Sequence, residues 1–225
     1  MSGLFTRKRL VATVAVGGLV VFSAVFAKQA TAPTSRSELQ PTRMQAQTSR
    51  TVVDLLDELH YEHRKLDDAL SAQIFDRYLK DLDGQRLYFL ASDIQGFEPW
   101  RNSFDNALKR SDVKGPFTIF NRYQQRAVER LDFVIGEIDK GVARMDFATE
   151  DTMEIDREQA PWATTRAELD DLWRKRLKAA ALSLRLAGKT DAEIQKTLGK
   201  RYRSQLNNLT RTKSDDAFQV FMNSF

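Results

Sequence analysis

The sequence predicts an all-α fold: an irregular multi-helix domain preceded by a signal peptide and a flexible linker. Three observations indicate this class. From Thr51 onward, apolar residues recur at spacings of three and four, which is the period of one helix face. Two Thr-x-x-Glu sequences, at Thr165 and Thr190, match the capping box that begins a helix. Gly84 and Gly188 follow apolar stripes, at positions where glycine favours the end of a helix.

The first 27 residues are typical of a secretory signal peptide. A basic cluster at 7–9 precedes the apolar run Leu10 to Phe26, and Ala27 offers a small residue for cleavage before Lys28. We therefore expect a periplasmic protein exported by a cleaved signal. The alternative is a retained anchor at the inner membrane, because 17 apolar residues reach the lower limit of a membrane span. The chain has no cysteine for a lipid anchor, a disulfide or a thiolate metal site.

Residues 28–50 are expected to form a disordered linker, because their polar composition offers little apolar surface to bury. Residues 51–225 are long enough for one domain with a substantial core. The chain has 35 basic and 31 acidic residues, and residues 1–27 hold three of the basic ones, so the remainder carries 32 − 31 = +1. A nearly balanced charge gives no support to nucleic-acid binding.

The first helices of the predicted domain follow in order. One apolar face spans 52–59, and a second helix over 66–82 is ended by Asp83-Gly84. The short apolar run 87–90 is expected to be a buried extended piece. One long helix is expected over 92–108. Another opens at Gly115-Pro116, because proline suits the first turn of a helix.

The last third predicts three more helices. The first runs from the Thr165 cap to Gly188, the second begins at Thr190, and the third is expected to be capped by Ser214. The apolar face of the third consists of Phe218, Val220, Phe221 and Phe225. We expect this face to lack a partner within the chain, and the sequence to be cut before further domains.

Three stretches carry a resemblance to a known family. They are 83–94 (DGQRLYFLASDI), 155–177 (IDREQAPWATTRAELDDLWRKRL) and 186–203 (LAGKTDAEIQKTLGKRYR). In order and spacing they resemble the N-terminal helical domain of tail-specific proteases, the carboxy-terminal processing peptidases (Prc or Tsp) of the bacterial envelope. The similarity covers the chain from about Thr51.

This resemblance implies a part of a larger serine endopeptidase. Family members continue into a PDZ domain and a protease domain that uses a Ser nucleophile and a Lys base. Nothing in the sequence matches those regions, so no catalytic residue is assigned here. The helical domain is expected to be a scaffold that encloses substrate. The implied partners are the protease and PDZ domains, in cis or in trans, unfolded proteins with apolar C-termini, and a helical-repeat adaptor lipoprotein.

The residues themselves offer one weak candidate for a metal site. His60 and His63 are the only histidines, spaced i and i+3 beside Asp57, Glu62 and Asp67. No third ligand is fixed by the sequence, and histidines also suit the last turn of a helix, where they bond the final carbonyls. We therefore predict no metal and no cofactor.

Other charged clusters have structural interpretations. The acidic pairs 67–68, 170–171 and 215–216 suit helix beginnings, where carboxylates interact with the helix dipole. The basic segment 174–178 is interrupted by apolar residues, as on a solvated helix face. The chain contains no G-x-S-x-G elbow and no phosphate-binding loop. A stand-alone helical binding module and an autonomous hydrolase with a novel site remain as alternatives.

Overall fold

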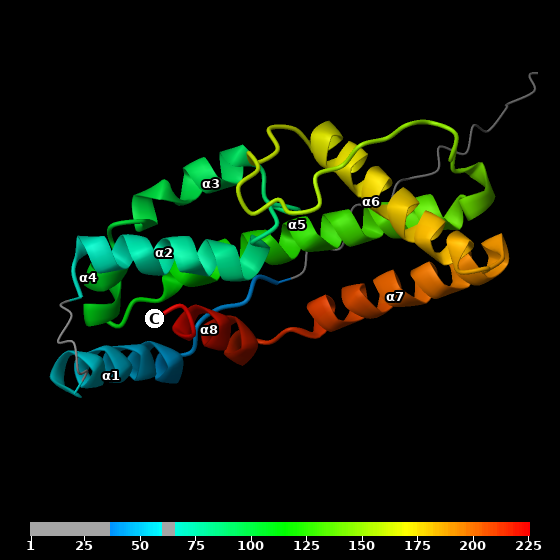
Figure 1. Cartoon of the computed structure of the whole chain (residues 1–225). Coiled ribbons are helices and arrows are strands. Elements are labelled where there is room, and N and C mark those ends of the chain that lie inside the picture. Colours follow the sequence, from blue (N-terminus) through cyan, green and yellow to red (C-terminus); the bar gives the residue numbers. More distant parts are fainter. Residues whose placement is uncertain (1–36, 60–65) are drawn as a thin grey trace, which may run out of the picture. The chain divides into compact units, whose positions relative to one another are not determined.

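The computed structural model describes residues 37–59 and 66–225. Within them the fold is all-α, as predicted (Figure 1). The helices are α1 (Arg43–Leu59), α2 (Asp68–Asp83), α3 (Ala91–Phe97), α4 (Phe104–Lys109), α5 (Lys114–Asp139), α6 (Arg166–Leu186), α7 (Asp191–Arg211) and α8 (Ser214–Met222), with short 3-10 turns at Glu98–Trp100 and Val142–Arg144. None of the helices in this part of the chain is long and apolar enough to cross a membrane.

Helical structure begins earlier than the composition predicted. α1 starts at Arg43, so the expectation of a disordered linker is wrong for residues 43–50. Ahead of α1, the backbone N–H and carbonyl of Leu39 both bond the side-chain amide of Asn121 on α5, each at 2.9 Å. This segment is held by hydrogen bonds to distant helices as well as by packing of Leu39 and Ala46 against the core, and a count of apolar residues does not detect the hydrogen bonds. Residues 1–36, including the predicted signal peptide, lie outside the described part.

The long helix expected over 92–108 is divided into α3, the turn Glu98–Trp100 and α4. Pro99 lies at the division, where its ring removes a backbone N–H and crowds the preceding turn. Phe97 and Phe104, on either side of the break, are both buried. The run 87–90 is largely buried, as predicted, but it is bent at 87–88 and not extended throughout; only Leu90 forms an isolated parallel bridge, to Ala163 in the loop before α6.

The helix caps observed in the structure match the predicted caps in part. At α7 the Thr190 hydroxyl accepts the Glu193 N–H, and the Glu193 carboxylate accepts the Thr190 N–H, which completes the predicted box. At α6 the Thr165 hydroxyl accepts the Glu168 N–H, as expected. The Glu168 carboxylate, however, accepts the N–H of Thr164 and not that of Thr165, so the box is incomplete. At α8 the cap is Lys213 and not Ser214, whose hydroxyl donates to a backbone carbonyl ahead of α1.

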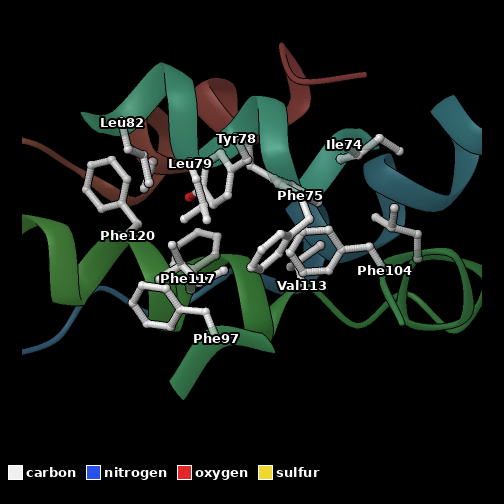
Figure 2. Packing of buried hydrophobic residues seen from close by; sticks show 14 of the residues in the cluster. Ile74, Phe75, Tyr78, Leu79, Leu82, Phe97, Phe104, Val113, Phe117 and Phe120 are labelled. Atoms are coloured by element: carbon white, nitrogen blue, oxygen red, sulfur yellow. The ribbon is translucent and has the colours of Figure 1, made fainter. Parts of the chain in front are cut away.

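Two apolar clusters form the core, and α5 contributes to both. The first joins α2, α4, α5 and α8 (Figure 2) and includes Ile74, Phe75, Tyr78, Leu79, Phe104, Phe117, Phe120 and Phe221. The second lies between α5, α6 and α7, and includes Leu131, Val134, Ile138, Trp173, Leu177, Ile194, Leu198 and Tyr202. α5 lies alongside α7, so the longest helix connects the two clusters.

The last helix is packed, which corrects the expectation of an unpartnered face. Phe221 is fully buried, and its ring centroid lies 5.3 Å from those of Tyr78 and Phe104, edge to face. Phe218 and Phe225 pack against the same cluster and are partly buried. The partners come from α2 and α4, more than 100 positions away in the chain, so helix periodicity could not reveal them.

Candidate functional site

The sequence DGQRLYFL forms a turn organised around one carboxylate. Asp83, the last residue of α2, accepts the backbone N–H groups of Leu87 at 2.7 Å and of Tyr88 and Phe89 at 2.9 Å. It is only 3% exposed. Burial raises the pKa of Asp83 to about 6, against the opposing effect of these three bonds and of the nearby Arg157 charge. The conformation of the turn therefore depends on a buried acid.

The next residues join this turn to the loop before α6. Arg86 has a φ of 52°, a left-handed conformation that is uncommon outside glycine. Its guanidinium donates to the carbonyl of Ala160 and lies 5.1 Å from the ring centroid of Trp162. The side-chain carbonyl of Gln85 accepts the backbone N–H of Arg157 at 2.9 Å. The strained residue is thus held by contacts that connect two of the motif stretches.

The third stretch joins through aromatic side chains. The indole N–H of Trp173, on α6, donates to the carbonyl of Leu87 at 2.8 Å. Its ring lies 5.6 Å from Tyr88 and 6.4 Å from Tyr202 of α7, centroid to centroid. Tyr88 in turn meets Tyr123 of α5 edge to face at 5.5 Å. All three stretches that carry the family resemblance therefore meet at one place.

We call this arrangement the motif latch and define it by Asp83, Arg86, Arg157, Trp162 and Trp173. The sequence identified the stretches that contain these residues and assigned Asp83 to the end of a helix, but it gave none of the five a role in joining these stretches. The sequence features that could have drawn attention to these residues are an Asp-Gly pair at a helix end and a tryptophan on a helix face. Neither signal shows which distant loop the turn contacts.

Two ion pairs connect α5 to α3 and to α6. Arg126 of α5 donates two bonds to the Asp93 carboxylate of α3, at 2.8 and 3.0 Å, and both residues are buried. Arg130, one turn further along α5, bonds Asp170 of α6. Removing one member of a buried charge pair leaves the other uncompensated, which is costly. Asp170, expected to serve a helix beginning, instead connects two helices.

The basic segment 174–178 is less solvated than expected. Arg174 lies over the ring of Phe133 at 5.4 Å, and Arg176 over that of Trp173 at 5.7 Å. Arginine stems and planes that cover aromatic rings contribute to packing as well as to charge. The helix face interpretation is therefore correct for only part of this segment.

In the described part of the chain, one lysine ammonium is hydrogen-bonded to a side-chain hydroxyl. Lys178 Nζ lies 2.5 Å from Thr149 Oγ1, beside a hollow of about 330 Å³ between α6 and the loop after α5. Asp151 binds the same ammonium at 2.5 Å, and this hydrogen bond lowers the pKa of the Asp151 carboxyl. A lysine that activates a nucleophile must be neutral, whereas this one is held in an ion pair. The contact fastens a loop to α6.

The proposed histidine pair lies outside the described residues, at positions 60 and 63. One of its acidic neighbours, Asp67, is the cap of α2 and accepts the Leu70 N–H at 3.0 Å, as the sequence predicted for such pairs. Among residues 37–59 and 66–225, no three His, Cys, Asp or Glu side chains are grouped so as to hold a metal ion.

Comparison with known proteins gives a consistent result. Residues 52–225 match the family model described as the tail-specific protease N-terminal domain. The tail-specific protease of Haemophilus influenzae (strain ATCC 51907 / DSM 11121 / KW20 / Rd) is 37% identical over 171 residues, which cover 76% of this chain. The chain spans 24% of the length of that relative. The chain belongs to the tail-specific protease family, and the part of the family that it matches is the N-terminal domain.

Proposed function

We propose that this chain forms a non-catalytic scaffold and substrate enclosure for a periplasmic carboxy-terminal processing endopeptidase, which degrades or trims envelope proteins from their C-termini. The observation that carries the proposal is the motif latch. The stretches that resemble the family converge on a buried brace between helices, where Asp83 and Trp173 bond backbone groups. Because these residues stabilise the arrangement of the helices, they support a structural role for the domain more than a catalytic one.

An exposed apolar face on α6 supports docking of this frame onto the rest of such a protease. Leu182 is 39% exposed and Leu186 is 81% exposed. They are four residues apart, so they lie on one face of the helix, together with the exposed Ala179 and Ser183. Exposed large apolar side chains grouped on a rigid element are typical of interaction sites.

The test is association in trans. The chain is added to a tail-specific protease from which the matching domain has been removed, and both binding and cleavage of an unfolded protein with an apolar C-terminus are measured. We expect binding and restored cleavage. The double variant Leu182→Ser, Leu186→Ser should bind at least about tenfold more weakly, since central apolar residues dominate such interfaces.

Met44→Ser serves as the matched control, because Met44 is 76% exposed on α1 and away from this face. Equal binding by all three proteins would contradict docking through α6. Binding to a helical-repeat adaptor lipoprotein, with none to the protease, would favour the stand-alone binding module.

The chain alone should not cleave the same substrate. The variant Thr149→Ala removes the hydroxyl bonded to Lys178 and should leave this result unchanged. Turnover by the purified chain that disappears in this variant would contradict the proposal and support the autonomous hydrolase.

A further inference from the structure

The loop that follows α5 is fastened to α6 and borders a hollow. Lys178 of α6 donates to the carbonyl and the hydroxyl of Thr149, at 3.2 and 2.5 Å, and binds the Asp151 carboxylate at 2.5 Å. Further along α6, the guanidinium of Arg185 lies 4.1 Å from the ring centroid of Phe147. The hollow between this loop and α6 has a volume of about 330 Å³. Small-molecule sites typically measure about 300–1,000 Å³, so the hollow is large enough for a small ligand.

Part of the wall of this hollow is apolar. Leu177 lines it from α6, is 2% exposed and belongs to the second core cluster. Met145 lines it from the loop and packs against the same cluster. At Gly141, which also lines it, an added Cβ would meet no atom within 4 Å, so the backbone there is open to a ligand. The core fixes this apolar wall, which favours a ligand with an apolar group because contact removes both from water.

The acids around the hollow are already engaged. Three of the four that line it form ion pairs of 2.5 to 2.8 Å with lysines that line it too; the pairs are Glu137–Lys140, Asp151–Lys178 and Asp171–Lys175. The fourth, Asp146, accepts the backbone N–H of Ala148 within its own loop, at 2.9 Å. The three lysines are therefore each balanced by a carboxylate of the hollow itself.

The remaining cations of the hollow are two guanidiniums. Arg144 lines it from the 3-10 turn after α5 and Arg174 from α6, and both are exposed. Neither makes an ion pair within residues 37–59 and 66–225, and Arg174 lies over the ring of Phe133 at 5.4 Å. A guanidinium presents a planar fork of N–H donors that matches a carboxylate. The hollow thus combines an apolar wall with two unpaired carboxylate-binding groups.

We propose that this hollow binds a small carboxylate that carries an apolar group, as at the end of a peptide or in a short fatty acid. The apolar group contacts Leu177 and Met145, and the carboxylate binds Arg144 and Arg174. The apolar wall distinguishes this ligand from phosphate or a polyanion, which would gain nothing from contact with it. The inference is independent of the proposed function, because binding is measured on this chain alone with small molecules.

The experiment is titration of the ¹⁵N-labelled full chain with octanoate and, separately, with N-acetyl-leucine, followed by NMR. Both should bind with a Kd of about 1–10 mM, as expected for ligands of about ten non-hydrogen atoms. The amide signals of Gly141 and Thr149 should shift, because both residues line the hollow.

Each part of the ligand has a matched control. N-acetyl-leucinamide keeps the apolar group and lacks the carboxylate, whereas acetate keeps the carboxylate and lacks the apolar group. Each should bind at least about tenfold more weakly than the ligand that has both. Inorganic phosphate tests whether the site accepts any anion.

The protein variants test the two guanidiniums. Arg144→Gln, Arg174→Gln should weaken the binding of octanoate and of N-acetyl-leucine at least about tenfold. The control Arg201→Gln, Arg211→Gln removes the same charge from exposed positions of α7 outside the hollow and should bind as the unchanged chain does. Circular dichroism verifies folding, and Arg144→Gln alone, expected to weaken binding about threefold, replaces the double variant if that one unfolds.

The following results would overturn the proposal. Equal binding of phosphate and octanoate would reduce the hollow to a general anion site, and equal binding of N-acetyl-leucine and its amide would show that the carboxylate is not recognised. Undiminished binding by the Arg144, Arg174 variant, or an equal loss in the α7 control, would exclude the two guanidiniums. The absence of saturable shifts up to about 50 mM would show that the hollow takes neither ligand. Binding of only one of the two carboxylates would support the site and identify the source of its ligand.

Discussion

Replacing Asp83 with alanine should destabilise the domain by about 2–5 kcal/mol. The change removes the acceptor of three backbone N–H bonds, two of them at the buried residues Leu87 and Phe89. A buried N–H without a partner costs about 1–3 kcal/mol, so the three would cost about 3–9 kcal/mol. Against this, the variant no longer buries a carboxylate. A pKa raised from 3.8 to about 6 corresponds to about 3 kcal/mol at neutral pH. Subtracting this from about 3–9 kcal/mol leaves a net loss of about 0–6 kcal/mol, whose central part is the expected 2–5 kcal/mol.

Urea denaturation followed by circular dichroism measures this loss as a lower midpoint at unchanged slope. Fluorescence of Trp162 and Trp173 reports on the latch itself, because both lie within it. Asp81→Ala is the control on the same helix. Its carboxylate is more exposed, forms a long ion pair of 3.9 Å with Arg77 and accepts a long hydrogen bond of 3.4 Å from the Ser224 hydroxyl, so its loss should cost at most about 1 kcal/mol. Equal stability of the two variants would refute the role assigned to Asp83.

Three further predictions concern the titration of Asp83, the packing of the last helix and the N-terminus of the exported protein. The folded-state pKa of Asp83 is raised from 3.8 to about 6, so its contribution to stability is full below the lower value and is lost as pH rises through the higher one. Between about pH 3 and pH 7, the free energy of unfolding should fall by about 3 kcal/mol more in the unchanged chain than in Asp83→Asn. Phe221→Ala should cost about 3–5 kcal/mol, and amide exchange around Phe221 should be as slow as around Leu177, since both are buried; rapid exchange there would restore the expectation of a frayed last helix. Mass spectrometry of the exported protein should find an N-terminus near Lys28, and recovery of intact Met1 in membranes would instead establish a retained anchor.

Local signals predicted most of the helices correctly. The cap at Thr190 and the stop after Asp83 were legible because capping and termination are decided by residues within one turn of each other. The division of the 92–108 helix at Pro99 was in principle equally local. The end of the predicted linker was misplaced because Leu39 is fastened by Asn121, which lies 82 positions away.

The family was also determined by the sequence, because three stretches in a fixed order suffice to identify it. Only the tertiary structure shows that these three stretches meet at one place. In the sequence, nothing indicates that Asp83, Arg86 and Trp173 act together. In the fold, each bonds a backbone group where a turn, a loop and α6 meet. Phe221 shows the same limit, since its burial depends on side chains of α2 and α4. Helix periodicity records which face of a helix is apolar, and only the packing of distant helices decides what that face meets.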